Sequence, residues 1–76
     1  MDGIAERVRR ARTSRGWTQE ELANRVDTTH MSISRYERGT VTPSVQVLSR
    51  IARSCGVSID WLVDGVGEEP EARGAS

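Results

Sequence analysis

The chain has 76 residues, of which 36% are apolar, and its formal net charge is zero. A chain of this length forms one domain, near the lower limit for folding without disulfides or metals. No apolar run is long enough to cross a bilayer, and the N-terminal segment is rich in arginine, so the composition argues against a membrane segment and a signal peptide. A cytoplasmic location is therefore expected.

Cysteine and histidine occur once each, as Cys55 and His30. A single cysteine cannot form an internal disulfide, which favours a reducing compartment. Cys55 falls at the end of a helical pattern beside Ile51, so it is predicted to be a small buried apolar side chain and not a reactive thiol. With one Cys, one His and no ligand spacing, neither a metal nor a cofactor is expected.

The charges are unevenly distributed along the chain. Residues 1–53 hold ten arginines against six acidic residues, a balance of +4, whereas residues 54–76 hold one arginine against five acidic residues, a balance of −4. A basic body with an acidic end suits nucleic-acid binding, although a solvated basic face without a ligand gives the same pattern.

The first predicted helix spans about residues 3–14. Asp2 can cap its N-terminus, and Gly16 is a natural stop. Its inward face consists of apolar residues spaced by four and three positions, Ile4, Val8 and Ala11.

The second helix has the clearest start signal in the chain. Thr18 is followed three residues later by Glu21, which is the pattern of a capping box. Trp17 and Leu22 have the spacing of a hydrophobic staple around the same start. The inner stripe of this helix is predicted to be Leu22, Ala23 and Val26.

Asp27 and Thr28 leave room only for a tight turn before the third helix, which is predicted over about residues 29–38 and ends at Gly39. Ile33 and Tyr36 are spaced by three and form its packing side. The rest of its surface is polar, with Met31 predicted to point outward among these polar residues.

The fourth helix is predicted to begin with Thr42 as the N-cap and Pro43 as the first helical residue, because proline tolerates that position. Its buried stripe is predicted to be Val45, Leu48, Ile51 and Ala52, and Gly56 ends it.

The fifth helix is capped by Ser58, carries Ile59 and Leu62 inward, and ends near Gly65. Residues 66–76 are rich in Gly, Glu and Ala and contain a proline, so they have too little apolar surface to order. They are expected to form an acidic, disordered tail.

The predicted fold class is all-α, a compact five-helix bundle formed by residues 1–65, because no stretch alternates apolar and polar residues as a strand does. The second and third helices, joined by a tight turn, have the form of a helix-turn-helix. Ala23 supplies the small side chain needed where the two helices cross, and Ile33 and Tyr36 support the third helix from behind.

Four segments of this pattern carry a family resemblance: TQEELA at 18–23, SISRYERG at 32–39, TPS at 42–44 and GVSIDWL at 56–62. Over about residues 3–65, without gaps, the chain resembles the xenobiotic-response-element-like family, the Cro and phage-repressor class of helix-turn-helix proteins. The resemblance implies a lambda-repressor-like fold, sequence-specific binding of duplex DNA, and a homodimer on a two-fold operator. One departure is Asp27, where the family commonly has the Gly that suits a left-handed backbone; Asp tolerates that conformation better than most residues.

The resemblance implies a base-reading surface on the third helix, formed by Thr29, His30, Met31, Ser34 and Arg35. The planar guanidinium of Arg35 can bond O6 and N7 of a guanine, or it can hold a phosphate. His30 can donate or accept at a base edge, or it can be a bystander. Met31 has no strong hydrogen-bonding group, so its natural contact is a thymine methyl.

The resemblance also implies contacts to the DNA backbone, which set register and give salt-sensitive affinity without choosing a sequence. These are expected at Arg12, Thr18, Gln19, Ser32, Arg38, Thr40 and Thr42. Arg12 and Glu37 are further expected to form an ion pair between the first helix and the end of the third; the alternative is two independent surface charges.

The remaining family position of note is Trp61, which is expected either in the core or at a dimer edge. Val57, Val63 and Val66 are expected to extend an apolar patch for a second subunit.

These expectations describe a double-stranded DNA-binding transcriptional regulator, with repression favoured and a phage, prophage or bacterial origin. It would insert its third helix into the major groove as a homodimer on a pseudo-palindromic operator. It would act in the cytoplasm of a bacterial host, associated with the nucleoid, without a small-molecule ligand. The alternative is a protein-interaction module or antitoxin component that retains the fold. An enzyme is not expected, because no nucleophile–base pair, carboxylate dyad or Gly-rich phosphate loop is present.

Overall fold

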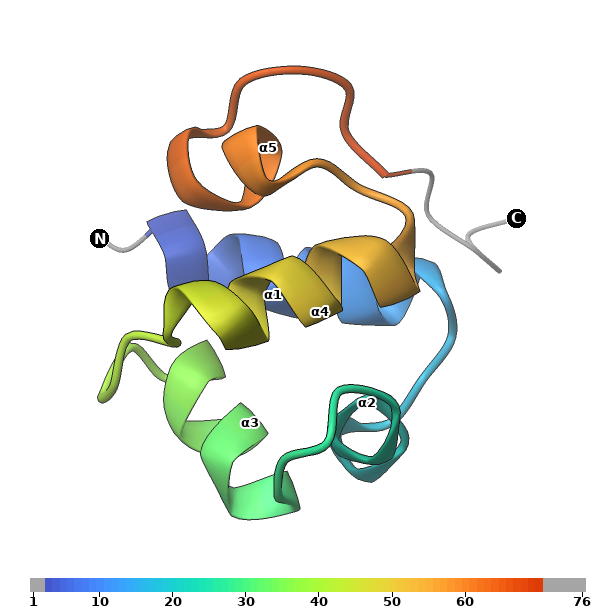
Figure 1. Ribbon diagram of the computed structural model, residues 1–76, viewed down its shortest axis with the longest axis vertical. Coiled ribbons are helices and arrows are strands. Elements are labelled where there is room, and N and C mark those ends of the chain that lie inside the picture. Colours follow the sequence, from blue (N-terminus) through green and yellow to red (C-terminus); the bar gives the residue numbers. More distant parts are fainter. Residues whose placement is uncertain (1–2, 71–76) are drawn as a thin grey trace.

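The computed structural model describes residues 3–70, which form five helices and no strand (Figure 1). The predicted all-α, five-helix fold class is confirmed. The predicted cap at Asp2 and the end of the tail, residues 71–76, lie outside the described residues. The helices are α1 (Gly3–Ser14), α2 (Gln19–Arg25), α3 (His30–Glu37), α4 (Val45–Cys55) and α5 (Ile59–Asp64).

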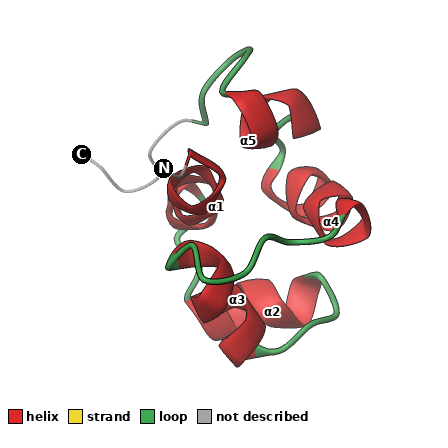
Figure 2. Cartoon of the chain, turned by 90° about the vertical axis from the view of Figure 1, so that its left-hand side faces the viewer, coloured by secondary structure: helices red, strands yellow, loops and turns green. Residues whose placement is uncertain are grey.

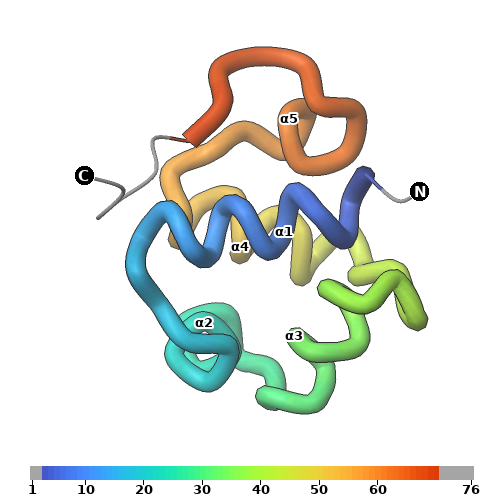
Figure 3. Tube along the Cα trace, turned by 180° about the vertical axis from the view of Figure 1, so that it is seen from behind, coloured from blue at the N-terminus to red at the C-terminus, as the bar shows by residue number. Residues whose placement is uncertain are grey.

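Helix α1 is the centre of the bundle. It packs against α3, α4 and α5, whereas α2 packs mainly against α3. Figures 1 and 3 show α5 on one side of α1 and the α2–α3 pair on the opposite side. In Figure 2, which looks along α1, α4 lies beside it. The two helices of the helix-turn-helix therefore form one end of the molecule, attached to the rest through α1.

Every helix contributes to a single hydrophobic core. Its largest fully buried side chains are Trp61, Leu22, Ile33, Ile51, Leu62, Val8 and Val26. Each such side chain contributes roughly 1.5–3 kcal/mol relative to an exposed one, so the core is what orders a chain with such short helices. Cys55 belongs to this core, as predicted, with 4% of its surface exposed.

The predicted start of α2 is confirmed. The backbone N–H of Glu21 donates to Thr18 Oγ1 at 3.1 Å, and the backbone N–H of Thr18 donates to Glu21 Oε1 at 2.8 Å, which completes the capping box. Trp17 is half-buried against the core, and the guanidinium of Arg25 lies 4.1 Å from the centre of its ring.

The predicted start of α4 is wrong by two residues. Ser44, and not Thr42, is the N-cap: the backbone N–H of Val47 donates to its hydroxyl at 3.2 Å, and the helix begins at Val45. Pro43 lies outside the helix and is buried. Because the sequence offers two hydroxyl residues around the proline, local signals alone do not decide between them.

Two predicted core residues, Val45 and Ile59, are instead exposed by 74% and 38%. Each is the first residue of its helix. Periodicity places such a residue on the apolar face of its helix. At the end of a helix, however, the residue is buried only if a neighbouring element packs over it. The following residues on these faces, Leu48 and Leu62, are buried.

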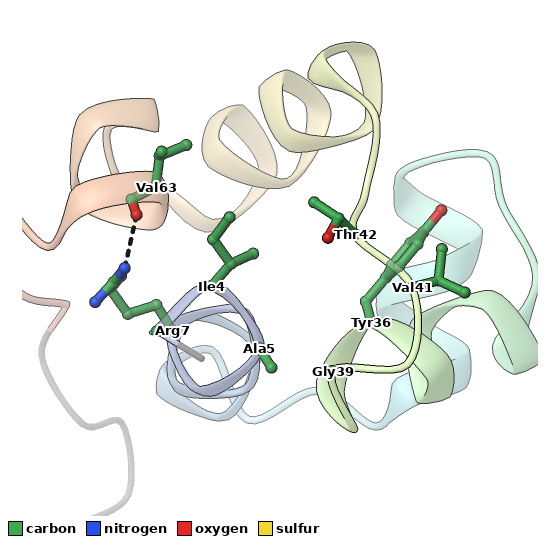
Figure 4. Close-up of a pocket in the computed structure, with 9 residues that line it drawn as sticks. Ile4, Ala5, Arg7, Tyr36, Gly39, Val41, Thr42 and Val63 are labelled. Atoms are coloured by element: carbon green, nitrogen blue, oxygen red, sulfur yellow. Dashed lines mark hydrogen bonds between the residues drawn. The ribbon is translucent and has the colours of Figure 1, made fainter. Parts of the chain in front are cut away.

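Arg7 attaches α5 to α1. Its Nε donates to the carbonyl of Leu62 at 2.9 Å and its Nη2 donates to the carbonyl of Val63 at 2.7 Å. Figure 4 shows this side chain reaching from α1 to the C-terminal end of α5. A cation at this end of a helix is favourable because the last carbonyls have no partner within the helix.

Substituting Arg7→Ala should lower the free energy of unfolding by about 1.5–3 kcal/mol, because two charge-assisted hydrogen bonds to α5 are lost. Chemical denaturation of the two proteins checks this value. Arg9→Ala on the same helix is the control: within residues 3–70 Arg9 pairs only with Glu6, both side chains are 57% exposed, and the change should cost less than about 1 kcal/mol. Equal losses for the two variants would contradict the role given to Arg7.

Candidate nucleic-acid interface

The turn between α2 and α3 is tight and holds one residue in the left-handed region. Asp27 has φ of 60°, as the sequence predicted for this position. The backbone N–H of Thr28 donates back to the carbonyl of Ala23 at 3.0 Å, which closes the end of α2. Ala23 is 1% exposed, so its small side chain lies where the helices pack. The orientation of α3 on α2 is thereby fixed over a connection of only four residues, 26–29.

Helix α3 has one buried side and one free side. Ile33 is completely buried and Tyr36 packs against the core. His30, Met31 and Arg35 are exposed, with Met31 at 59%. Arg35 Nη2 lies 3.4 Å from the Met31 sulfur, so the guanidinium and the thioether form one continuous surface. Ser34 is half-buried at the edge of it.

Thr29 is the N-cap of α3, a role the sequence analysis did not assign to it. Its Oγ1 accepts from the backbone N–H of Ser32 at 3.0 Å and lies 3.0 Å from the Ser32 hydroxyl. The side chain is exposed, but its hydroxyl is engaged within the helix end. Ser32 is half-buried beside it.

A buried ion pair joins α1 to the end of α3, at the residues the sequence predicted. Arg12 Nε donates to Glu37 Oε2 at 2.7 Å and Arg12 Nη2 donates to Glu37 Oε1 at 3.0 Å, while Nη1 donates to the carbonyl of Trp17 at 2.8 Å. The two side chains are 14% and 4% exposed. Arg12 therefore braces the helices, and only the small exposed part of its guanidinium is left for a phosphate.

Two further hydrogen bonds extend this pair to the surface. Gln19 Nε2 donates to Glu37 Oε1 at 3.1 Å, and Gln19 Oε1 lies 3.0 Å from Nε2 of His30. Sequence reasoning missed both contacts. The crossing of α2 and α3 brings Gln19, the first residue of α2, close to both ends of α3. This indicates that the residues are near one another but not that they form hydrogen bonds.

The other predicted phosphate-contacting residues surround the ends of α3. Thr18 is exposed beside the start of α2, although its hydroxyl serves the capping box. Arg38, Thr40 and Thr42 are exposed where α3 ends and in the loop before α4. Gln19 is half-buried, and one hydrogen of its amide remains after the bond to Glu37.

The model of the helix-turn-helix family matches residues 8–62 of this chain. The chain belongs to this helix-turn-helix family, in its Cro and phage-repressor class. It is 33% identical over 62 residues to YonR, a prophage-derived HTH-type transcriptional regulator of Bacillus subtilis, a match that covers 82% of this chain and 57% of YonR. It is 30% identical over 56 residues to multiprotein-bridging factor 1 of Schizosaccharomyces pombe, covering 74% of this chain and 38% of that protein. This chain thus spans only part of the length of these relatives.

Solved structures show the same arrangement of helices. The P22 c2 repressor, solved in complex with a synthetic operator, superimposes with a TM-score of 0.80 at 26% identity, covering 86% of this chain and 98% of that one. The N-terminal DNA-binding domain of SinR from Bacillus subtilis gives a TM-score of 0.77 at 30% identity, covering 86% and 96%. The five helices are those of a lambda-repressor-like domain. Among these proteins, YonR is named a transcriptional regulator and P22 c2 a repressor.

Only some of the residues expected to contact a second subunit are exposed on the surface. Trp61 is 1% exposed and lies under Arg10, whose guanidinium is 5.5 Å from the ring, so it is a core residue and offers no surface to a partner. Of the two places expected for Trp61, the core is the one that the structure shows. Val57 and Val63 are half-buried against the core, and Val66 is 61% exposed.

Among residues 3–70 no group of three potential metal ligands comes together, and none of the helices is long and apolar enough to cross a membrane.

A pocket of about 450 Å³ opens between α1, the end of α3 and α5 (Figure 4). Its lining mixes apolar side chains such as Ile4 and Val63 with polar groups, and its one cation, Arg7, is held by α5. Burial raises the pKa of Cys55 to about 11, against a smaller lowering effect of Arg15, so this thiol is protonated at neutral pH.

Replacing Arg12 with methionine should lower the free energy of unfolding by about 3–5 kcal/mol, because it leaves the Glu37 carboxylate buried without its counter-charge. Thermal and chemical denaturation measure the change. The double variant Arg12→Met/Glu37→Met should recover a large part of the loss, since an apolar pair of similar size is often as stable as a buried ion pair. A single variant within about 1 kcal/mol of the parent would show that this pair does not brace the helices.

Proposed function

We propose that this protein is a transcriptional regulator that binds double-stranded DNA in a sequence-specific manner and represses transcription. Helix α3 enters the major groove, and the protein acts as a homodimer on a pseudo-palindromic operator. The likeness to the P22 c2 repressor, whose structure was solved with an operator, supports this proposal.

One observation carries the proposal: the free side of α3 presents His30, Met31 and Arg35 to solvent while Ile33 is completely buried behind them. The major groove accepts a single helix and displays acceptors, donors and thymine methyls to it. The guanidinium of Arg35 can donate to the acceptors, the imidazole of His30 can accept from the donors, and the thioether of Met31 can contact the thymine methyls. Such a set has no function in stabilising the chain's own core.

The charge of α3 favours a polyanion over an acidic or neutral protein surface. The only acidic residue of this helix is Glu37, whose side chain is 4% exposed and neutralised by Arg12. Arg35 and Arg38 are exposed. The alternative of a protein-interaction module would be favoured by exposed acidic or large apolar groups on α3, and Met31 is the only residue that fits this description.

Contacts to the DNA backbone come from hydroxyl, amide and guanidinium groups around α3. Arg38, Thr40 and Thr42 follow α3, and Thr18, Gln19 and Ser32 lie near the starts of α2 and α3. These contacts fix the register of α3 in the groove, and the cationic ones make affinity fall with rising salt.

The homodimer forms through the apolar surface at α5. Ile59 and Val66 are exposed by 38% and 61%, and Val57 and Val63 are half-buried nearby in the chain. Two copies related by a two-fold axis would place their α3 helices in successive major grooves about 34 Å apart. The operator would then contain two inverted half-sites.

Selection of bound fragments from random DNA tests the proposed function. The expected result is a pair of inverted half-sites roughly 10 bp apart, centre to centre. Enrichment of a lone half-site would overturn the homodimer while leaving DNA recognition in place. No enrichment over a protein-free control would overturn the regulator itself.

Arg35→Ala should weaken binding to the selected operator by about 1–3 kcal/mol and relax the preference at one base pair of each half-site. Arg53→Ala is the matched control, because Arg53 is an exposed arginine on α4 that the proposal places away from the bases. Fluorescence anisotropy with the operator and with every single-base variant gives both values. An unchanged sequence preference in Arg35→Ala would contradict its base-reading role.

A further inference from the structure

The base-reading position His30 is tied through Gln19 to the buried Glu37, and these bonds determine how its imidazole can bind a base. We propose that Glu37, acting through Gln19, holds His30 with its proton on Nε2, so that Nδ1 is the hydrogen-bond acceptor offered to DNA. His30 then selects a base with an exocyclic amino group, adenine or cytosine, at one position of the contacted strand. The DNA part of this inference rests on the proposed function.

The first step is the orientation of the Gln19 amide. Both oxygens of the Glu37 carboxylate already accept hydrogen bonds from Arg12, and an ionised carboxylate has no proton to donate. The Gln19 atom 3.1 Å from Glu37 Oε1 must therefore be the amide nitrogen. With the nitrogen directed at Glu37, the carbonyl oxygen of Gln19 is the atom that faces His30.

The second step is the tautomer of His30. An amide oxygen only accepts, so the imidazole nitrogen 3.0 Å from Gln19 Oε1 must be a donor and must carry a proton. In a neutral imidazole the other nitrogen then holds a lone pair. That nitrogen is Nδ1, and within residues 3–70 it has no hydrogen-bond partner. His30 is exposed at the start of α3, so Nδ1 remains for an external donor.

The base preference follows from the donors and acceptors that each base displays in the major groove. The amino groups of adenine and cytosine are its donors, whereas guanine and thymine present acceptors at their edges. An acceptor at Nδ1 therefore favours adenine or cytosine and is repelled by guanine or thymine. Gln19 is a positioning residue in this scheme, and the buried charge of Glu37 is the origin of the preference.

The tautomer is tested first, on the free protein. His30 is the only histidine of the chain, so its two ring nitrogens give a single set of signals in long-range ¹H–¹⁵N NMR spectra. In spectra recorded at pH 8 the proton is expected on Nε2 in the parent. In Gln19→Leu the ring should show more averaging between the two tautomers. Gln46→Leu, which removes an exposed glutamine of α4, should leave the signals as in the parent. A parent ring with its proton on Nδ1 would overturn the inference, whether or not the protein binds DNA.

Base preference is tested next, at pH 8, on the selected operator with every base placed at each position. The parent should prefer adenine or cytosine by about 5- to 10-fold at one position, the value of a single net hydrogen bond. His30→Ala should lose that preference and keep the others. Gln19→Lys should reverse it toward guanine or thymine, because an ammonium group donates to His30 Nε2 and moves the ring proton to Nδ1.

A parent that binds no duplex overturns the proposed function, whereas the NMR signals of the free protein still decide the tautomer. A parent that reads its operator while His30→Ala retains every base preference overturns the reading role of His30 and leaves the proposed function intact.

Discussion

A buried carboxylate sets the geometry on which the proposed recognition surface depends. The side chain of Glu37 is 4% exposed at the end of α3, so its charge must be compensated inside the protein. The compensation comes from two other helices, through Arg12 of α1 and Gln19 of α2. Helix α3 is thereby held at one end by polar contacts and at its middle by the buried Ile33. A helix fixed in this way can present its outer side chains to a ligand without first having to be ordered, which lowers the entropic cost of binding.

Local signals were sufficient for most of the fold. The capping box at Thr18 and Glu21 and the stop at Gly56 depend on residues close in sequence, and both are present in the structure. The errors fall at helix starts. Val45 and Ile59 lie in the correct helical phase but at positions where no neighbouring element covers them, and the arrangement of neighbouring elements cannot be read from periodicity.

Contacts between distant residues were predictable only where the family resemblance indicated a pair. Arg12 and Glu37 were found in this way. The hydrogen bond from Arg7 to the carbonyl of Val63, 56 positions away, could not be predicted from the sequence. Every residue has a backbone carbonyl, so the residue type at position 63 does not indicate the contact. The hydrogen bonds of Gln19 to Glu37 and His30 were also not predicted. They depend on how α2 and α3 cross, and the sequence analysis considered each of these residues separately.

The most direct test of the proposed recognition surface is to map, by NMR, which backbone amides of the protein change on addition of the selected duplex. The largest changes should fall on residues 29–35 and on the first turn of α2, with smaller ones in the loop after α3. Changes concentrated on α4 and α5, with α3 unaffected, would contradict the proposed recognition surface, because the duplex would then be bound by a surface that the Glu37 network does not hold in place.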